Sequence, residues 1–303
     1  MTTDSELSIK QRVYRKICFL FGKIIPDKAY IKMMYFVKLG KKCNLENPQT
    51  FDEKLNYLKL NDRNPKYSQL ADKYLVRDYV TKIIGEDYLI PLLGVWDNPD
   101  NIPFDMLPEQ FVLKCNHDSA SVIICKDKSG KCGEPFACQA AVKKLSASLK
   151  TNYFYASREW PYKDIKPVVI AEQYMEDESG TELKDYKIYC FNGKPHLIQV
   201  DFGRFVHHER NLYDTEWNYI DKQIEYPKNP SHQIAKPASL ETMLELAQKL
   251  AEDIGSPSIR IDFYDINGKV YFGEITFYQE GGFAKFEPEE YGVELGDAIN
   301  INK

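Results

Sequence analysis

Two short runs of β-branched and aromatic residues, joined by an Asn-Gly pair, constrain the fold of this chain more than any other segment. Residues 260–283 read RIDFYDINGKVYFGEITFYQEGGF, and Asn267-Gly268 is typical of a tight turn between antiparallel strands. Asp262 and Glu274 each lie six positions from Gly268, so the count allows their carboxylates to face each other across a hairpin.

Facing carboxylates repel each other unless a cation lies between them. Magnesium takes hard oxygen ligands, usually together with substrate phosphates. The hairpin therefore favours a magnesium site at Asp262 and Glu274. These residues alone leave one alternative open, a solvated hairpin with exposed acids.

The composition is that of an ordinary folded protein with about two domains or subdomains. The chain has 303 residues, of which 43% are hydrophobic and 13% aromatic, enough for a core and a cleft. Its net charge of −5 provides no global field to attract nucleic acid, so we expect no nucleic-acid partner.

The cysteines indicate a reducing compartment. Seven scattered cysteines, an odd number, in a chain without a cleavable N-terminal signal favour free thiols and a cytoplasmic location. Cys125, Cys132 and Cys138 are close in sequence, but they lack the paired two-residue gaps and the fourth ligand of common structural zinc sites. Zinc is therefore not expected.

No run of about 18 uninterrupted apolar residues occurs, so no helix is expected to span a membrane. Residues 13–42 mix Lys and Arg with large apolar side chains. This pattern is typical of amphipathic helices that pack on the body of a protein. It is also compatible with peripheral association at the inner, anionic face of a membrane.

The chain divides into three parts on its patterning. Residues 1–85 form a helical N-terminal region, residues 86–175 a first α/β part and residues 176–303 a second part that contains the hairpin. Thr50 and Glu53 form a capping box that predicts a helix start. Further helices are expected at residues 70–84, 136–150 and 240–254, and strands at 88–96, 110–115, 167–174, 185–191 and 196–201, the last two joined by Asn192-Gly193.

Lys114 ends a hydrophobic strand, where an ammonium group must either snorkel to solvent or face an anion such as a phosphate. The loop that follows, NHDSAS at 116–121, carries His117, Ser119 and Ser121, whose polar groups could wrap phosphate oxygens. It lacks the glycines of a strong phosphate-binding loop. A lone loop histidine such as His117 is also a common hydrogen-bonding surface residue.

Another hydrophobic strand ends in Ala171-Glu172-Gln173-Tyr174. Backbone groups around Glu172 and Tyr174 could contact a purine edge while the carboxylate accepts ribose hydroxyls. A solvent-facing acid after a buried strand is the alternative.

The order of the segments resembles the ATP-grasp superfamily. The chain has, in turn, a strand lysine, a polar loop, VVIAEQY, KDYKIYCFNGKPHLIQVDFGR and RIDFYDINGKVYFGEIT. Within this superfamily the chain is most similar to the TupA-like group, which acts in polysaccharide and teichuronopeptide biosynthesis. The segments that carry this likeness are NPQTFDEKLNYLKL, DKYLVRDYV, FVLKCNHDSAS and REWPYKDIKPVVIAEQYM. The likeness covers nearly all of residues 20–300. It implies an α+β ATP-grasp fold, in which two α+β subdomains clamp a nucleotide, with the helical region at the N-terminus.

The resemblance also implies roles for single residues. Lys114 matches a lysine that contacts nucleotide phosphates, and Glu172 matches the hinge acid near adenine and ribose. The other matches are Asp185 and Lys187 beside the nucleotide, Arg204 at the acceptor carboxylate or acyl phosphate, and Asp262 and Glu274 as magnesium ligands. Many relatives carry Glu-x-Asn as the second metal motif, whereas this chain has Glu274-Ile275-Thr276, which puts metal ligation by Thr276 in doubt.

The implied reaction uses ATP and Mg²⁺ to activate a carboxylate as an acyl phosphate, from which an amine displaces phosphate. Lys187 and Arg204 are then the residues expected at the reacting groups. The expected partners are a glycan or lipid-linked glycan precursor with a uronic-acid carboxyl, and an amino acid or amine. Aromatic residues at 153–162 could stack on a sugar or pack in the core. The rival functions are a glycosyltransferase of polysaccharide biosynthesis and a noncatalytic nucleotide-binding scaffold. A glycosyltransferase normally binds its metal through an Asp-x-Asp pair at the end of a strand, and the sequence has no such pair.

Overall fold

Two antiparallel sheets form the centre of the molecule, which is a computed structural model that describes residues 8–131, 133–177, 183–203 and 208–301. The α+β architecture predicted from the sequence is confirmed. Helices lie at α1 Ile9–Phe21, α2 Asp27–Leu39, α3 Phe51–Asn61, α4 Lys66–Ala71, α5 Val76–Ile83, α6 Cys138–Leu149, α7 Phe154–Ser157, α8 Leu240–Ile254 and α9 Glu290–Asp297, and a short 3₁₀ helix, η5, at Gln279–Gly282.

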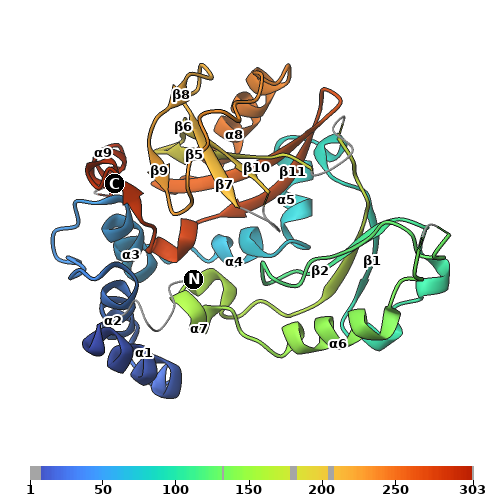
Figure 1. The fold of residues 1–303 in the computed structure, drawn as a ribbon, viewed down its shortest axis with the longest axis horizontal. Helices are drawn as coiled ribbons and strands as arrows, with labels where there is room; N and C mark the ends of the chain where they lie inside the picture. The colour runs from blue at the N-terminus through green and yellow to red at the C-terminus, as the bar shows by residue number, and fades with distance from the viewer. Residues whose placement is uncertain (1–7, 132, 178–182, 204–207, 302–303) are drawn as a thin grey trace.

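The strands lie at β1 Leu92–Trp96, β2 Phe111–Cys115, β3 Ile123–Cys125, β4 Val169–Gln173, β5 Asp185–Phe191, β6 Lys194–Phe202, β7 Glu209–Tyr213, β8 Tyr219–Ile220, β9 Gln223–Ile224, β10 Ser258–Ile266, β11 Lys269–Thr276 and β12 Phe286–Glu287. The four-stranded sheet has the order β1-β4-β2-β3, and the six-stranded sheet has the order β11-β10-β5-β6-β7-β8. Figure 1 shows the smaller sheet on the right, with α6 below it, and the larger sheet at the top beside α8.

The six-stranded sheet owes its fixed register to two Asn-Gly turns and one amphipathic helix. Asn192-Gly193 joins β5 to β6 and Asn267-Gly268 joins β10 to β11, and all four residues have positive φ, as the predicted hairpin turns require. Helix α8 spans the predicted residues 240–254, buries an apolar stripe against the sheet and ends at Gly255 with φ 71°.

The predicted helix at residues 70–84 is wrong as a single element, because it is two helices, α4 and α5, with a break between them. Asp72 causes the break: its Oδ1 accepts hydrogen bonds from the backbone N–H groups of Tyr74 (2.8 Å) and Leu75 (3.1 Å) and so starts a new helix. Its Oδ2 accepts a hydrogen bond from Asn116 Nδ2 at 2.8 Å. The break therefore fixes the α4–α5 connection to the loop after β2.

The N-terminal helices are bound tightly to the rest of the protein through α3. The predicted capping box of Thr50 and Glu53 is confirmed at its start. Lys59, near its end, is fully buried and donates hydrogen bonds to the backbone oxygens of Ser157 (2.9 Å) and Gly281. Asn56 Nδ2 lies 2.6 Å from Gly282 O. Helix α3 thus holds η5 in place.

Candidate active site

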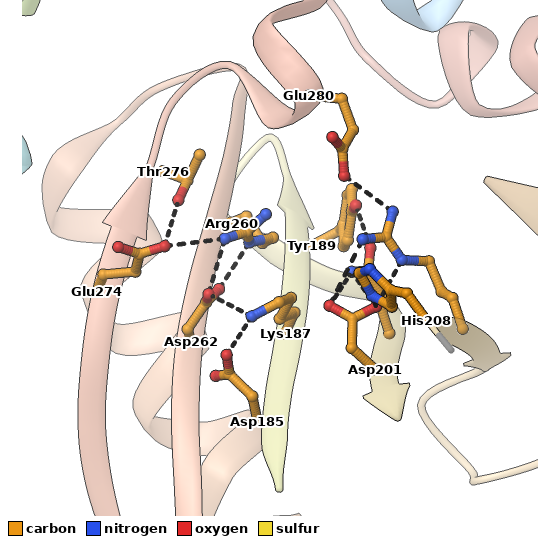
Figure 2. Close-up of polar contacts among 12 residues, drawn as sticks. Asp185, Lys187, Tyr189, Asp201, His208, Arg260, Asp262, Glu274, Thr276 and Glu280 are labelled. Carbon is orange, nitrogen blue, oxygen red and sulfur yellow. Dashed lines mark hydrogen bonds and ion pairs between the residues drawn. The ribbon is translucent and has the colours of Figure 1, made fainter. Parts of the chain in front are cut away.

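A layer of polar side chains covers the face of the six-stranded sheet that turns away from α8. Side chains alternate along a strand, so Ile188, Ile198 and Ile261 join the α8 core while their neighbours point to the other face. That face carries Glu274 and Thr276 on β11, Arg260 and Asp262 on β10, Asp185, Lys187 and Tyr189 on β5, Gln199 and Asp201 on β6, and Arg210 on β7 (Figure 2).

A β-bulge places Glu274 opposite Asp262. The strands pair regularly from the turn up to Phe263 and Phe272, and the register then shifts so that Asp262 pairs with Glu274. Gly273 is the extra residue. If the strands paired regularly, without the bulge, Asp262 would pair with Gly273, and Glu274 would point to the opposite face of the sheet. The expected facing of the two carboxylates is therefore confirmed, and the bulge is its physical cause.

Arg260 supplies a cation between the two facing carboxylates. Its Nε lies 2.7 Å from Asp262 Oδ1, and its Nη2 lies 2.7 Å from Asp262 Oδ2 and 3.1 Å from Glu274 Oε1. Such bidentate pairing is strong and geometrically specific. Sequence reasoning missed Arg260, although strand alternation from Asp262 places it on the same face and could have found it.

Lys187 adds a second cation to this group. Its Nζ lies 3.1 Å from Asp262 Oδ2 and also contacts the Asp185 carboxylate (Figure 2). The structure thus brings together four residues selected from the sequence: Asp185, Lys187, Asp262 and Glu274. Their roles in binding nucleotide or metal remain predictions.

Lys73, from the connection between α4 and α5, links the six-stranded sheet to the polar loop of the smaller one. Its Nζ lies 3.4 Å from Glu274 Oε2 and 2.7 Å from the backbone oxygen of Asp118. Its backbone N–H donates to Asn116 O at 3.0 Å. No local sequence pattern marked this lysine, because its role depends on contacts distant in the chain.

The charge of Glu274 is fixed by these neighbours. Burial alone would raise the pKa of its carboxyl, but Lys73, Arg260 and Lys187 outweigh burial and lower the pKa to about 2. The side chain of Glu274 is 31% exposed. Glu274 is therefore an ionised oxygen donor that solvent can reach.

On the smaller sheet, Lys114 pairs with Glu172. Lys114 Nζ lies 2.6 Å from Glu172 Oε2, and Arg77 Nη1 lies 3.4 Å from Glu172 Oε1. All three side chains are at most 16% exposed. Two predicted nucleotide-binding residues therefore lie together on adjacent strands, β2 and β4, with an arginine that the sequence did not single out. Tyr174, just after β4, lies with its ring 5.5 Å from Lys126 Nζ.

The loop at 116–121 is held by hydrogen bonds within the loop and to neighbouring segments of the chain. Ser121 Oγ donates to Asp118 and accepts the Cys115 N–H at 2.8 Å. His117 is buried, and its Nε2 lies 3.2 Å from Ser148 O and 3.0 Å from Thr151 O, at the end of α6. Ser119 Oγ lies 3.4 Å from Tyr153 OH. Phosphate contacts by His117, Ser119 and Ser121 remain predictions. In the structure His117 ties the loop to the end of α6, and Ser121 bonds to Asp118 within the loop and to Cys115 before it.

A second polar cluster continues across β6 and β7. Arg210 Nε lies 2.6 Å from Asp201 Oδ1, and Arg210 Nη1 lies 2.9 Å from Glu280 Oε1. His208 Nε2 lies 3.4 Å from Asp201 Oδ1 (Figure 2). Burial opposes ionisation of Asp201, but the nearby His208 and the charge of Arg210 hold its pKa well below the usual value. Arg204, predicted to bind the acceptor, lies outside the described residues.

The oxygen donors on β10 and β11 are of the chemical type that magnesium prefers, although Arg260 and Lys187 already pair with both oxygens of the buried Asp262. Asp262 and Glu274 are paired carboxylates, and the Thr276 hydroxyl lies 3.5 Å from Glu274 Oε1 on the same face. Within the described ranges, no group of three or more His, Cys, Asp or Glu side chains is arranged to hold a metal ion. Cys125 and Cys138 instead direct their sulfurs to the backbone oxygens of Glu109 and Phe136, each at 3.6 Å, and Cys132 is outside the described residues.

Some of the aromatic residues at 153–162 pack inside the protein. Phe154 is buried. Trp160 stacks on Tyr67 at 5.9 Å and donates a hydrogen bond from Nε1 to Tyr278 OH at 2.9 Å. These contacts support the core-packing alternative for Phe154 and Trp160 over a sugar-stacking role.

Three of the solved structures that this chain matches are ligases of low sequence identity. D-alanine–D-alanine ligase from Helicobacter pylori has 15% identity and a TM-score of 0.44, covering 82% of this chain and 69% of its own. D-alanine–D-alanine ligase from Bacillus anthracis complexed with ATP has 16% identity and a TM-score of 0.39, and the match covers 69% of this chain and 53% of the enzyme. L-amino acid ligase from Bacillus licheniformis has 12% identity and a TM-score of 0.41, and the match covers 95% of this chain and 61% of the ligase. The chain thus spans about half to two thirds of these proteins.

No curated protein matches the chain. The family of TupA-like ATPgrasp proteins matches residues 53–300, which include both of these sheets and every side-chain contact of the candidate active site. The resemblance found in the sequence motifs is thereby confirmed: the chain belongs to the TupA-like ATP-grasp family.

Proposed function

We propose that this protein is an ADP-forming carboxylate–amine ligase that acts on a surface glycan or its lipid-linked precursor. It would join a uronic-acid carboxyl to an amino acid or another amine. Membership of the ATP-grasp family supports ATP as the activating substrate. The observation that carries the proposal is the position of Glu274, which contacts Arg260 on its own sheet and Lys73 beside the loop of the other sheet.

The main barrier in this reaction is electrostatic. A carboxylate oxygen attacks the γ-phosphorus of ATP, the bond to the β-phosphate oxygen breaks, and an acyl phosphate and ADP form. Both reactants are anions, so cations that already point into the site lower the barrier most. In this proposal Lys73 and Lys114, now paired with Glu274 and Glu172, would bind phosphate oxygens, and Arg260 and Lys187, now paired with Asp262, would orient the attacking carboxylate.

Magnesium would be held by Asp262, Glu274 and Thr276, where it supplies charge neutralisation to phosphate oxygens. The second half-reaction needs an amine, whose nitrogen displaces phosphate from the acyl carbon and loses a proton. Glu280, with a side chain 26% exposed, lies on η5 beside Arg210 and would attract the ammonium form of that amine.

The proposal is tested by incubating the purified protein with ATP, Mg²⁺, uronate oligosaccharides and a panel of amino acids. We expect ADP, phosphate and an amide-linked product in equal amounts. Glu274→Gln should abolish turnover and leave the fold intact, whereas Glu245→Gln, at an exposed position on α8, should not change the rate.

Release of AMP, or no nucleotide turnover with any carboxylate, would reject the ligase. Release of a nucleoside diphosphate from a nucleotide sugar would identify a glycosyltransferase instead. Full function of a Glu274→Gln variant in glycan assembly would point to a noncatalytic scaffold.

A further inference from the structure

Helix α1 turns its most apolar side toward solvent. Ile9, Val13 and Leu20 are 81%, 48% and 69% exposed. At about 100° per residue these three positions fall within about 40° of one another on a helical wheel. Figure 1 shows α1 at the lower left edge of the molecule, remote from both sheets.

The opposite side of α1 is the one that packs on α2. Cys18 is buried there, and the ring of Tyr14 lies 5.8 Å from that of Phe36. Gln11 Nε2 donates hydrogen bonds to Phe36 O (3.2 Å) and Val37 O (3.0 Å). A surface helix of a globular protein normally buries its apolar stripe. Helix α1 instead docks through a polar and aromatic side and leaves the aliphatic stripe uncovered.

The exposed apolar surface continues through the last turn of α1 and past its end to Ile24. Phe19, Phe21 and Ile24 are 87%, 51% and 77% exposed. Large apolar side chains exposed together on a short segment mark an interaction site more often than an ordinary surface.

The same segment is strongly basic. Residues 9–26 contain five basic side chains and no acidic one, although the whole chain has a net charge of −5; the basic residues are Lys10, Arg12, Arg15, Lys16 and Lys23. Arg12 and Lys16 lie along one flank of the aliphatic stripe and Lys10 along the other. Long basic side chains at such flanks can reach headgroups while the stripe enters the acyl boundary.

We propose that the outer face of α1, together with Phe21 and Ile24, binds the surface of an anionic lipid bilayer and holds the protein there as a peripheral protein. The apolar stripe provides burial and the basic flanks provide attraction to the headgroups. This inference goes beyond the proposed ligase activity and does not depend on it.

A second copy of the chain is the competing occupant of this face. A symmetric dimer through α1 would place the same surface patch of both copies in contact. Such an interface would bring the basic side chains of residues 9–26 in the two copies close together. Like charges at close range oppose such an interface, whereas anionic lipid headgroups neutralise them.

Sedimentation of the full chain with lipid vesicles tests the proposal. We expect binding to vesicles of phosphatidylcholine mixed with phosphatidylglycerol, weaker binding to phosphatidylcholine alone, and loss of binding as salt is raised. Leu20→Asp should lower the vesicle partition coefficient at least tenfold, and Lys16→Glu several-fold. Because Leu20 is exposed, Leu20→Asp should keep the wild-type melting temperature.

Met106→Asp is the matched control. Met106 is 84% exposed on a short 3₁₀ helix at Phe104–Met106, far along the chain from α1, so this variant should bind vesicles as the wild type does. Three results would overturn the proposal: no binding to anionic vesicles, equal loss of binding in Leu20→Asp and Met106→Asp, or a wild-type dimer that Leu20→Asp converts to a monomer without any vesicle binding.

Discussion

Lys73 lies with its ammonium nitrogen 3.4 Å from Glu274 Oε2, and this ion pair joins the connection between two helices to the edge strand of the larger sheet. The same ammonium group contacts the backbone oxygen of Asp118 in the loop after β2. Two segments separated by about two hundred residues of chain thereby meet at one carboxylate. A group bound between the sheets would encounter Lys73 and Glu274 together.

Replacement of Lys73 should impair nucleotide use. Lys73→Met removes a cation placed to bind phosphate, and losses of one preorganised donor reduce rates on the order of a hundredfold. We expect that loss in kcat/KM for ATP, measured by ADP release. Lys82→Met, at an exposed position in the last turn of α5, is the control. Equal rates in the two variants would remove Lys73 from the site.

Removal of Arg260 should make the protein depend on magnesium for stability. Arg260→Met leaves Asp262 and Glu274 facing each other without their guanidinium, which should cost about 3–5 kcal/mol of unfolding free energy. Added Mg²⁺ should recover part of this loss because it binds the folded state. Urea unfolding with and without Mg²⁺ measures both effects.

Arg63→Met is the control for that experiment. Arg63 lies 3.8 Å from Asp27, and its side chain is 43% exposed, so its loss should change stability by less than about 1 kcal/mol. The same magnesium effect on Arg260→Met and Arg63→Met would argue against a cation site between the carboxylates.

Gly273 should tolerate no branched side chain. A Cβ at this position would lie 3.0 Å from Asp262 O and 3.3 Å from the Tyr264 ring. Gly273→Val should therefore cost about 1–3 kcal/mol and displace Glu274 from Asp262, with a larger loss of activity than of stability. The same change at Gly133, where a Cβ meets nothing within 4 Å, should be harmless. Full ligase activity in Gly273→Val would show that the bulge is not needed.

The buried Lys59 predicts an unusual alkaline dependence of stability. Burial lowers its pKa to about 8, with Glu159 and Asp52 acting against this shift. In the unfolded chain a lysine loses its proton near about 10.4. Between these values the unfolded state binds more protons, so the wild type gains stability as pH rises from 8 to about 10.

Lys59→Met lacks this titration and leaves the Ser157 and Gly281 carbonyl oxygens without their donor. We therefore expect the variant to be less stable, with a difference from the wild type that grows over the same pH range. Chemical unfolding of both proteins at several pH values measures the difference. A constant difference from pH 7.5 to 10 would contradict the pKa shift.

Local patterns in the sequence predicted much of this fold because their causes are local. The Asn-Gly turns, the Thr50–Glu53 capping box and α8 depend on residues close in sequence, and all are confirmed. The α4–α5 break was missed, because the same residues also fit a continuous helix. The Asp72 carboxylate breaks it by accepting hydrogen bonds from the Tyr74 backbone N–H and from Asn116, forty-four positions away.

The candidate site was predicted less completely for the same reason. Alternation along β5 and β10 selects Lys187 and Asp262 once the strands are known. Glu274 shares their face only because of the bulge at Gly273, which simple alternation does not predict. Lys73 and Arg77 enter through contacts between segments far apart in the chain, which periodicity does not contain. His117 matched a phosphate-loop pattern by composition, yet its ring is held by the end of α6.

The most direct test of the central claim is a crystal structure of the protein with Mg²⁺ and a nonhydrolysable ATP analogue. We expect one triphosphate in contact with Lys73 and Lys114, with the metal bound by Asp262 and Glu274. A nucleotide bound away from these four side chains, or a triphosphate that reaches only one of the two sheets, would contradict it.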